Sequence, residues 1–141
     1  MSYQFKILEK HEILGCLPLI FKLNQRRIPE NTLKDRLLEM AQQQYECAAI
    51  FKNEAMVGVC GLWYCTRHYS GRSVEVDHVF IEEAHRGKGL GKTFFKWLYT
   101  YLKQKGYETI ELNTYVTNTA SHKFYYNEGF KILGYHFLKT L

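Results

Sequence analysis

The chain of 141 residues is long enough for one domain, which we predict to span residues 1–141 and to bury roughly two-thirds of its unfolded surface. Hydrophobic residues make up 46% and charged residues 23%, with only two prolines, so the composition is that of a globular protein and not of a low-complexity segment. The net charge of +5 suits an anionic ligand, but it does not distinguish a small molecule from nucleic acid or an anionic surface.

The cysteines and the apolar stretches bear on metal binding and on location. Cys16, Cys47, Cys60 and Cys65 form no C-x-x-C pair, and no group of His and Cys has zinc spacing, so we expect no metal and mostly buried free thiols. Free thiols favour a reducing compartment. The N-terminus has no apolar signal-peptide core, and the longest helical apolar stretch, residues 13–21, is too short to span a bilayer. We therefore expect a soluble, cytoplasmic protein that does not bind membranes.

Apolar periodicity assigns the elements of the first half of the chain. The predicted helices are residues 11–23 and 30–44, and the predicted strands are residues 3–8, 47–51, 56–66 and 73–81. A break at residues 26–29 separates the two helices, and the polar turn Lys52-Asn53-Glu54 separates the second strand from the third.

The second half of the chain is predicted to begin with a long amphipathic helix. Its apolar residues recur on one helical face at Leu90, Phe94, Trp97, Leu98, Tyr101 and Leu102. Gly106 ends this helix. A strand at residues 108–115, a short helix at 118–127 and a last strand at 130–138 complete the chain.

The predicted order is strand, helix, helix, three strands, helix, strand, helix, strand. This order indicates an α/β fold, in which helices cover both faces of a mixed sheet. The fourth strand, the helix that follows it and the fifth strand form a crossover unit, so these two strands are expected to be parallel.

The stretch from Arg86 to Thr93 reads R-G-K-G-L-G-K-T and precedes the long helix. Glycines let the backbone approach an anion, and a helix N-terminus presents N–H groups that no helical carbonyl occupies, so we predict a site for phosphate oxygens. A Walker loop would need glycine at position 86, which is Arg86, and glycines at 87, 89 and 91 lack the G-x-G-x-x-G spacing of dinucleotide-binding folds. The spacing that fits is R-x-x-G-x-G.

This loop resembles the pyrophosphate loop of the GNAT superfamily of acetyl-CoA-dependent N-acetyltransferases. A second stretch is similar to the superfamily pattern N-x-x-A-x-x-x-Y-x-x-x-G-F, with serine where alanine is usual: Asn118, Ser121, Tyr125, Gly129 and Phe130. The resemblance covers about residues 55–135. It implies acetyl-CoA as cosubstrate and a mixed, mostly antiparallel sheet of six to seven strands, in which the parallel strands four and five splay apart.

The resemblance also implies which residues bind acetyl-CoA. The expected residues are Val79, Phe80, Ile81, Arg86, Gly87, Lys88, Gly89, Leu90, Gly91, Lys92, Asn118 and Tyr125. The loop N–H groups and cations are expected to bind the pyrophosphate, and the strand backbone to pair with the pantetheine arm. One N–H, of Phe80 or Ile81, is expected to stabilise the oxyanion. The alternative is a basic helix cap without ligand, which the entropy cost of three glycines disfavours.

Tyr125 is expected to protonate the departing thiolate, as the tyrosine at this place of the motif does in the superfamily. A phenol with a pKa of about 10 stays protonated at neutral pH and can donate a proton. Tyr125 could instead be one more packed aromatic residue, and Tyr126 is a neighbouring candidate. Asn118 is expected to contact the cofactor near pantetheine or to cap the short helix, and the two roles are compatible.

Two acids stand in the middle of the predicted fourth strand, where unpaired carboxylates are costly to bury. Strict alternation places Glu75, Asp77, Val79 and Ile81 on one face, and Val74, Val76, His78 and Phe80 on the other. Glu75 lies eleven residues before Arg86, which resembles the general-base glutamate of histone-type GNAT enzymes, so we expect it to deprotonate the amine, directly or through water. The alternatives are that Glu75 or Asp77 recognises a cationic substrate or pairs with Arg or Lys. His78 is expected to face the core.

The resemblance implies an enzyme that moves an acetyl group from acetyl-CoA to a primary amine, a small amine or a lysine or N-terminal amine, in a ternary complex. The alternative is a CoA-binding sensor or regulatory module without catalysis. No feature typical of nucleic-acid binding is present. The acceptor pocket is expected to draw on residues 25–30 with Tyr64, His68 and Tyr69, but the acceptor itself stays open. We also expect an exposed sheet edge that a homodimer could cover.

Overall fold

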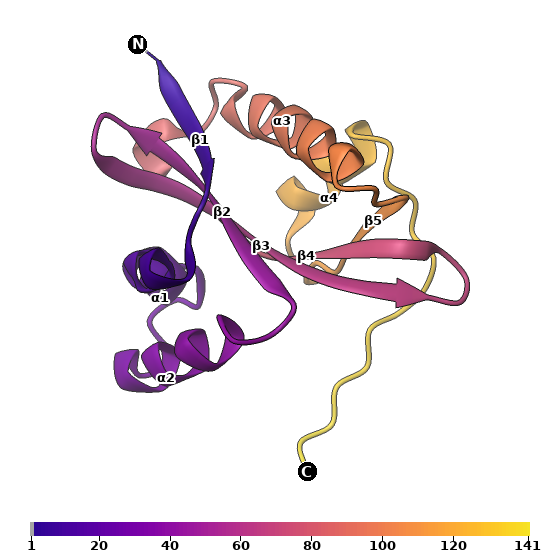
Figure 1. The fold of residues 1–141 in the computed structure, drawn as a ribbon, viewed down its shortest axis with the longest axis horizontal. Coiled ribbons are helices and arrows are strands. Elements are labelled where there is room, and N and C mark those ends of the chain that lie inside the picture. Colours follow the sequence, from indigo (N-terminus) through magenta and orange to yellow (C-terminus); the bar gives the residue numbers. More distant parts are fainter. Residues whose placement is uncertain (1) are drawn as a thin grey trace.

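Five strands form a single sheet in the order β1-β2-β3-β4-β5, with helices on both faces (Figure 1). The computed structural model describes residues 2–141. The elements are β1 Tyr3–Ile7, a 3₁₀ helix Lys10–Cys16, α1 Leu17–Leu23, α2 Glu30–Met40, β2 Tyr45–Lys52, β3 Ala55–Arg67, β4 Gly71–Ile81, a 3₁₀ turn Glu83–His85, α3 Leu90–Gln104, β5 Thr109–Leu112 and α4 Thr119–Asn127. Within the described residues, none of these helices has the length and apolar character that a membrane span requires.

The strand directions confirm the predicted crossover. All neighbouring strands are antiparallel except β4 and β5, which are parallel and connected through α3. β5 pairs with only residues 73–76 of β4, although β4 continues to Ile81. From Asp77 onward, no described strand therefore pairs with the edge of β4 on the β5 side. This is the expected separation of the fourth and fifth strands.

Two hydrophobic clusters fill the opposite faces of the sheet. Helices α1 and α2 cover one face, and α3 and α4 cover the other (Figure 1). The apolar face predicted for α3 is confirmed at Leu90, Phe94, Leu98 and Leu102, which are buried. Trp97 and Tyr101 are only half-buried, and Phe95, which was not predicted to face the core, is buried as well. The positive φ of +87° at Gly106 ends the helical path where the sequence predicts it.

A β-bulge in β4 changes which side chains share a face. Cys60 pairs with Val79 and Leu62 with Val76, so both Asp77 and His78 lie opposite the single residue Gly61. The prediction from strict alternation is therefore wrong beyond Asp77. Val79 and Ile81 pack on the α3 side together with Val74 and Val76, whereas Phe80 packs on the α1 and α2 side. Because of the extra residue in the bulge, each later side chain of β4 lies on the face opposite to the one that strict alternation predicts.

The predicted last strand, residues 130–138, does not form, and the sheet has five strands where six to seven were predicted. The N–H of Phe130 donates to the carbonyl of Tyr125, but no described partner forms a backbone hydrogen bond with residues 131–141. Figure 1 shows this segment leaving the body of the molecule. An apolar, strand-like sequence forms a strand only against an edge that exchanges hydrogen bonds with it, and here the segment reaches no edge.

Replacing Phe94 with Ala is expected to lower the free energy of unfolding by about 3–5 kcal/mol, because the ring is fully buried and packs against Phe5 and Phe95. Urea denaturation followed by circular dichroism measures this loss. As a control, Leu38→Ala on α2, where the residue is 47% exposed, is expected to cost less than about 1 kcal/mol. Similar losses in both variants would contradict this description of the core.

Candidate active site

The glycine loop presents an array of free backbone donors at the start of α3. Gly87 and Gly89 adopt left-handed φ angles of +75° and +73°, and Gly89 is the residue before the first turn. Among the described residues, none accepts a hydrogen bond from the backbone N–H groups of residues 87–92. A Cβ added at Gly87 or Gly89 would meet nothing within 4 Å, so open space lies beside these N–H groups. Free N–H groups beside open space at a helix N-terminus are typical of an anion site.

Arg86 connects this loop to the end of β4. Its Nε donates to the carbonyl of Ile81 at 2.6 Å, and its guanidinium lies 5.1 Å from the centre of the Phe80 ring. The side chain also borders a cavity of about 420 Å³, lined by Lys22, Gln25, Arg26, Phe80, Glu82, Glu83 and Arg86. The contact with Ile81 thus fixes the guanidinium beside the free edge of β4, while its other N–H groups stay open to a ligand.

Tyr125 lies inside the cluster between α3 and α4. Its ring packs against Phe95, Phe124 and Phe130, at centroid distances between 5.4 and 6.0 Å. Burial raises the pKa of its hydroxyl to about 12, and no described residue forms a hydrogen bond with that hydroxyl. Its neighbour Tyr126 is 77% exposed. Of the two candidate tyrosines, only Tyr125 therefore points into the fold.

Asn118 caps α4, which confirms one of its two expected roles. Its Oδ1 accepts a hydrogen bond from the backbone N–H of Ser121 at 3.3 Å. This contact fixes the start of the helix that carries Tyr125. The contact of Asn118 with a cofactor stays a prediction.

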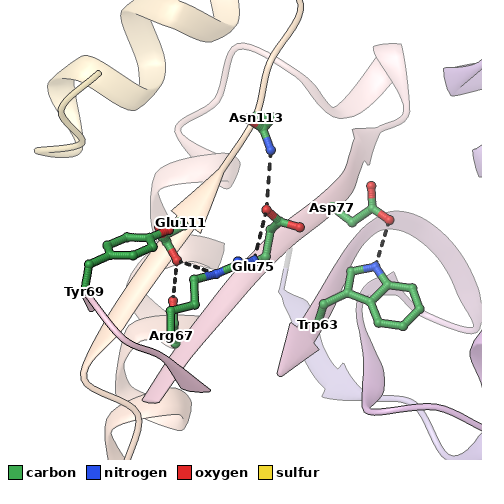
Figure 2. Close-up of polar contacts among 8 residues, drawn as sticks. Trp63, Arg67, Tyr69, Glu75, Asp77, Glu111 and Asn113 are labelled. Atoms are coloured by element: carbon green, nitrogen blue, oxygen red, sulfur yellow. Dashed lines mark hydrogen bonds and ion pairs between the residues drawn. The ribbon is translucent and has the colours of Figure 1, made fainter. Parts of the chain in front are cut away.

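Glu75 lies in a cluster of charged side chains between β3, β4 and β5 (Figure 2). The register places Glu75 directly opposite Glu111 on β5. Arg67 reaches both carboxylates, with Nη2 3.7 Å from Oε1 of Glu75 and Nε 3.1 Å from Oε2 of Glu111. Asn113 donates to Oε1 of Glu75 at 3.4 Å. Pairing with an arginine was one of the alternatives for Glu75, and the structure shows this pairing with Arg67.

Glu111 is the most constrained carboxylate of this cluster. The hydroxyl groups of Tyr69 and Ser73 donate to it at 2.5 and 2.7 Å. Its partial burial acts to raise its pKa, but these hydrogen bonds and the charge of Arg67 prevail, so the pKa lies below its usual value and the carboxylate stays ionised. No sequence motif pointed to Glu111, Arg67 or Asn113 as residues of this site. Glu111 could have been noticed from the sequence, because it is an acid in the middle of the strand predicted at residues 108–115.

The residues expected for the acceptor pocket are only partly brought together. Tyr69 contacts Glu111, and His68 packs against Tyr69 at a centroid distance of 5.4 Å. Tyr64 instead lies on the α3 side of the sheet, where its hydroxyl donates to Glu46 at 2.5 Å. Tyr64 is therefore not part of the acidic cluster.

The bulge residues have partners on the α1 and α2 side of the sheet. The indole N–H of Trp63 donates to Asp77 at 3.0 Å (Figure 2), and the hydroxyl of Tyr45 is hydrogen-bonded to Nε2 of His78. The absence of a side chain at Gly61 makes room for His78, because a Cβ there would lie 2.5 Å from Nε2. Burial lowers the pKa of His78 from 6.5 to about 4, so the imidazole is neutral near pH 7.

A family model described as the acetyltransferase (GNAT) family matches residues 13–130. The chain belongs to this family. An aminoalkylphosphonate N-acetyltransferase of Salmonella typhimurium is 28% identical over 74 residues, which are 52% of this chain and 48% of the relative. This GNAT chain thus spans about half the length of the curated relative that it matches.

Solved structures share the fold of this GNAT chain over nearly its whole length. A ribosomal-protein-alanine N-acetyltransferase from Brucella melitensis biovar Abortus 2308 has a TM-score of 0.82 and 17% identity, and the match covers 99% of both chains. Aminoglycoside N-acetyltransferase AAC(6')-Iy in complex with CoA has a TM-score of 0.81 and 15% identity, covering 99% of this chain and 95% of that one. At sequence identities this low, the comparison shows a shared fold and nothing more.

The buried imidazole of His78 makes the stability of this GNAT protein depend on pH. The unfolded chain binds a proton at His78 near pH 6.5 and the folded protein only near pH 4, so this contribution is complete above pH 6.5 and is lost as the pH falls towards 4. Between pH 7 and pH 4.5, the free energy of unfolding of the wild type is expected to fall by about 2 kcal/mol more than that of His78→Gln, because the variant has no imidazole to protonate. Urea denaturation at both pH values measures this difference.

The matched control is His136→Gln, because His136 is exposed and belongs to no described element. This variant is expected to keep the pH dependence of the wild type. A His78→Gln protein with the same acid sensitivity as the wild type would contradict the neutral, buried state of His78.

Proposed function

We propose that this chain is an N-acetyltransferase that transfers an acetyl group directly from acetyl-CoA to a primary amine. The observation that carries the proposal is the continuity of two open donor surfaces: the free N–H groups of residues 87–92 and the unpaired edge of β4 from Asp77 to Ile81. A phosphate site that continues into a free strand edge suits a ligand with a pyrophosphate at one end and amide groups along an arm. CoA has this composition.

The loop and β4 divide the binding of acetyl-CoA between them. The N–H groups from Gly87 to Gly91 would hold the pyrophosphate, with charge from Lys88, Lys92 and Arg86. The backbone of Val79, Phe80 and Ile81 would pair with the amides of the pantetheine arm, as an added strand pairs with a sheet edge. An N–H of Phe80 or Ile81 would then stabilise the negative charge that develops on the acetyl oxygen.

Tyr125 would act as the general acid. Its hydroxyl has no described hydrogen-bond partner, which leaves it able to donate to the departing sulfur. Because burial raises its pKa to about 12, the hydroxyl keeps its proton through the neutral range. Loss of this proton therefore does not limit activity at ordinary pH.

Glu75 would act as the base, directly or through water, and the cluster around it would bind the amine. The carboxylates of Glu75, Asp77 and Glu111 lie on one side of the sheet and attract a cationic ammonium group. Arg67 balances part of this charge and orients Glu75. The names of the similar proteins leave both classes of amine open, because two of them name small amines, an aminoalkylphosphonate and an aminoglycoside, and one names a ribosomal protein.

The described cysteines support a reducing, cytoplasmic location. All four are free thiols, with Cys16, Cys47 and Cys60 buried and Cys65 exposed. An exposed free thiol is compatible with a compartment that keeps thiols reduced.

Replacing Gly89 with Ala is expected to weaken acetyl-CoA binding by about 10- to 100-fold, because a side chain there opposes the left-handed backbone that aims the N–H groups. Calorimetric titration with acetyl-CoA measures the affinity. The control is Gly106→Ala, which opposes a left-handed backbone of similar φ (+87°) at the opposite end of α3, displaces only the end of the Arg72 side chain and is expected to leave the affinity unchanged. Equal affinities in the two variants would exclude the loop as the pyrophosphate site.

Replacing Tyr125 with Phe is expected to lower kcat by about 100-fold or more, with little change in acetyl-CoA affinity, because only the proton donor is lost. The amine for this assay comes from a screen of aminoalkylphosphonates, aminoglycosides and lysine peptides, read out as release of free CoA thiol. Tyr126→Phe is the control and is expected to keep full activity. Tight acetyl-CoA binding without turnover on any amine would favour the sensor alternative, and full activity of Tyr125→Phe would move the acid elsewhere.

A further inference from the structure

A hollow of about 200 Å³ lies directly beside the glycine loop. Its lining residues are Tyr3, Phe5, Lys88, Leu90 and Thr93. Two of them, Lys88 and Leu90, belong to the loop itself, so the hollow adjoins the open N–H groups of residues 87–92. The two aromatic rings come from β1, at the edge of the sheet opposite β5. The candidate active site includes no residue of β1, and the hollow is therefore a separate feature next to it.

Alternation along β1 turns these rings toward α3. Tyr3, Phe5 and Ile7 are half-buried and pack on the α3 side of the sheet, whereas the two residues between them are exposed. The hydroxyl of Tyr3 is hydrogen-bonded to Nδ1 of His85 at 2.9 Å, and Figure 1 shows the start of β1 beside the loop that leads into α3. These contacts hold the Tyr3 ring at a fixed place next to the glycine loop.

The chemistry of the hollow suits a nucleotide base. Its lining combines aromatic and apolar side chains with one cation, and none of the described lining residues is acidic. A second cation is close by, since Nζ of Lys52 lies 5.6 Å from the centre of the Tyr3 ring. Bases stack on aromatic rings, and nearby lysines attract the phosphates that a nucleotide carries. Pockets for drug-sized ligands measure roughly 300–1,000 Å³, so a hollow of this size suits one part of a larger ligand.

We propose that this hollow binds the adenine of acetyl-CoA, with the base against the ring of Tyr3 and the 3′-phosphate of the ribose attracted by Lys52 and Lys88. The inference rests on the proposed function. The adenosine of CoA is joined directly to the pyrophosphate, so a base in the hollow lies within one nucleotide of the loop N–H groups. The pantetheine arm leaves the other end of the pyrophosphate and stays free to run along β4. The cosubstrate thus contacts β1, the glycine loop and β4.

A subsite for the base determines which acetyl donors the protein accepts. Carrier proteins present an acyl group on the same phosphopantetheine arm, but no adenosine is attached to that arm. Stacking on one aromatic ring corresponds to about 10-fold or more in affinity. Free acetyl-CoA is therefore expected to bind more tightly than a donor that has only the arm.

The experiment is calorimetric titration of the full chain with three probes: acetyl-CoA, phosphopantetheine and adenosine 3′,5′-bisphosphate. Replacing Tyr3 with Leu removes the ring but keeps an apolar side chain against α3. This variant is expected to bind acetyl-CoA and adenosine 3′,5′-bisphosphate about 10-fold or more weakly than the wild type. Its affinity for phosphopantetheine is expected to stay unchanged, because that probe has no base to place in the hollow.

Two control variants separate stacking from other effects. Tyr3→Phe keeps the ring and loses only the hydrogen bond to His85, so it is expected to bind all three probes as the wild type does. Tyr126→Leu removes an exposed tyrosine of α4 that does not line the hollow, and it is expected to change none of the three affinities.

Three results would overturn the adenine subsite and leave the proposed function intact. The first is an unchanged affinity of Tyr3→Leu for acetyl-CoA. The second is an equal weakening for phosphopantetheine, which would reveal a general loss of structure. The third is a loss in Tyr126→Leu that spares phosphopantetheine, which would place the base on α4. A wild-type chain that binds no acetyl-CoA at all would refute the proposed function and the subsite with it.

Discussion

The short pairing of β4 with β5 is the constraint on which the rest of the site depends. Because β5 pairs with only residues 73–76, the rest of that edge of β4 pairs with no described strand. The crossover through α3 that connects the two strands also brings the N-terminus of that helix to the end of the same edge. One topological feature therefore produces both the glycine loop with its free N–H groups and the strand edge next to it.

β4 also separates the charges of the site. At its C-terminal end, Arg86 and the glycine loop form a cationic region with open N–H groups, and the first turn of α3 contains no acid. In its middle, Glu75 lies beside Glu111 and Arg67 of the neighbouring strands, and Asp77 accepts a hydrogen bond from Trp63. One strand thus holds a cationic and an acidic region at a fixed spacing, as the proposed reaction between an anionic cosubstrate and a cationic amine requires.

Much of the fold follows from local patterns that act over a few residues. The helix at α3, the left-handed ends at Gly89 and Gly106 and the cap at Asn118 are consequences of periodicity and backbone chemistry, and all lie where the sequence predicts them. The bulge at Asp77 and His78 is different, because it depends on the empty space that Gly61 of another strand provides. Alternation along one strand contains no information about its neighbour, so the faces of Val79 and Phe80 were assigned wrongly.

By itself, the sequence determined the order of the elements as far as α4, the glycine loop before α3 and the two motifs that resemble the family, since each depends on residues close together in the chain. Only the tertiary structure decided that Arg67 and Glu111 surround Glu75, that Tyr125 and not Tyr126 points inward, and that the C-terminal segment leaves the sheet at five strands. The physical reason is that strand register and side-chain burial are set by distant segments. A strand-like sequence favours an extended segment, but only the tertiary structure determines whether a sheet edge is there to pair with it.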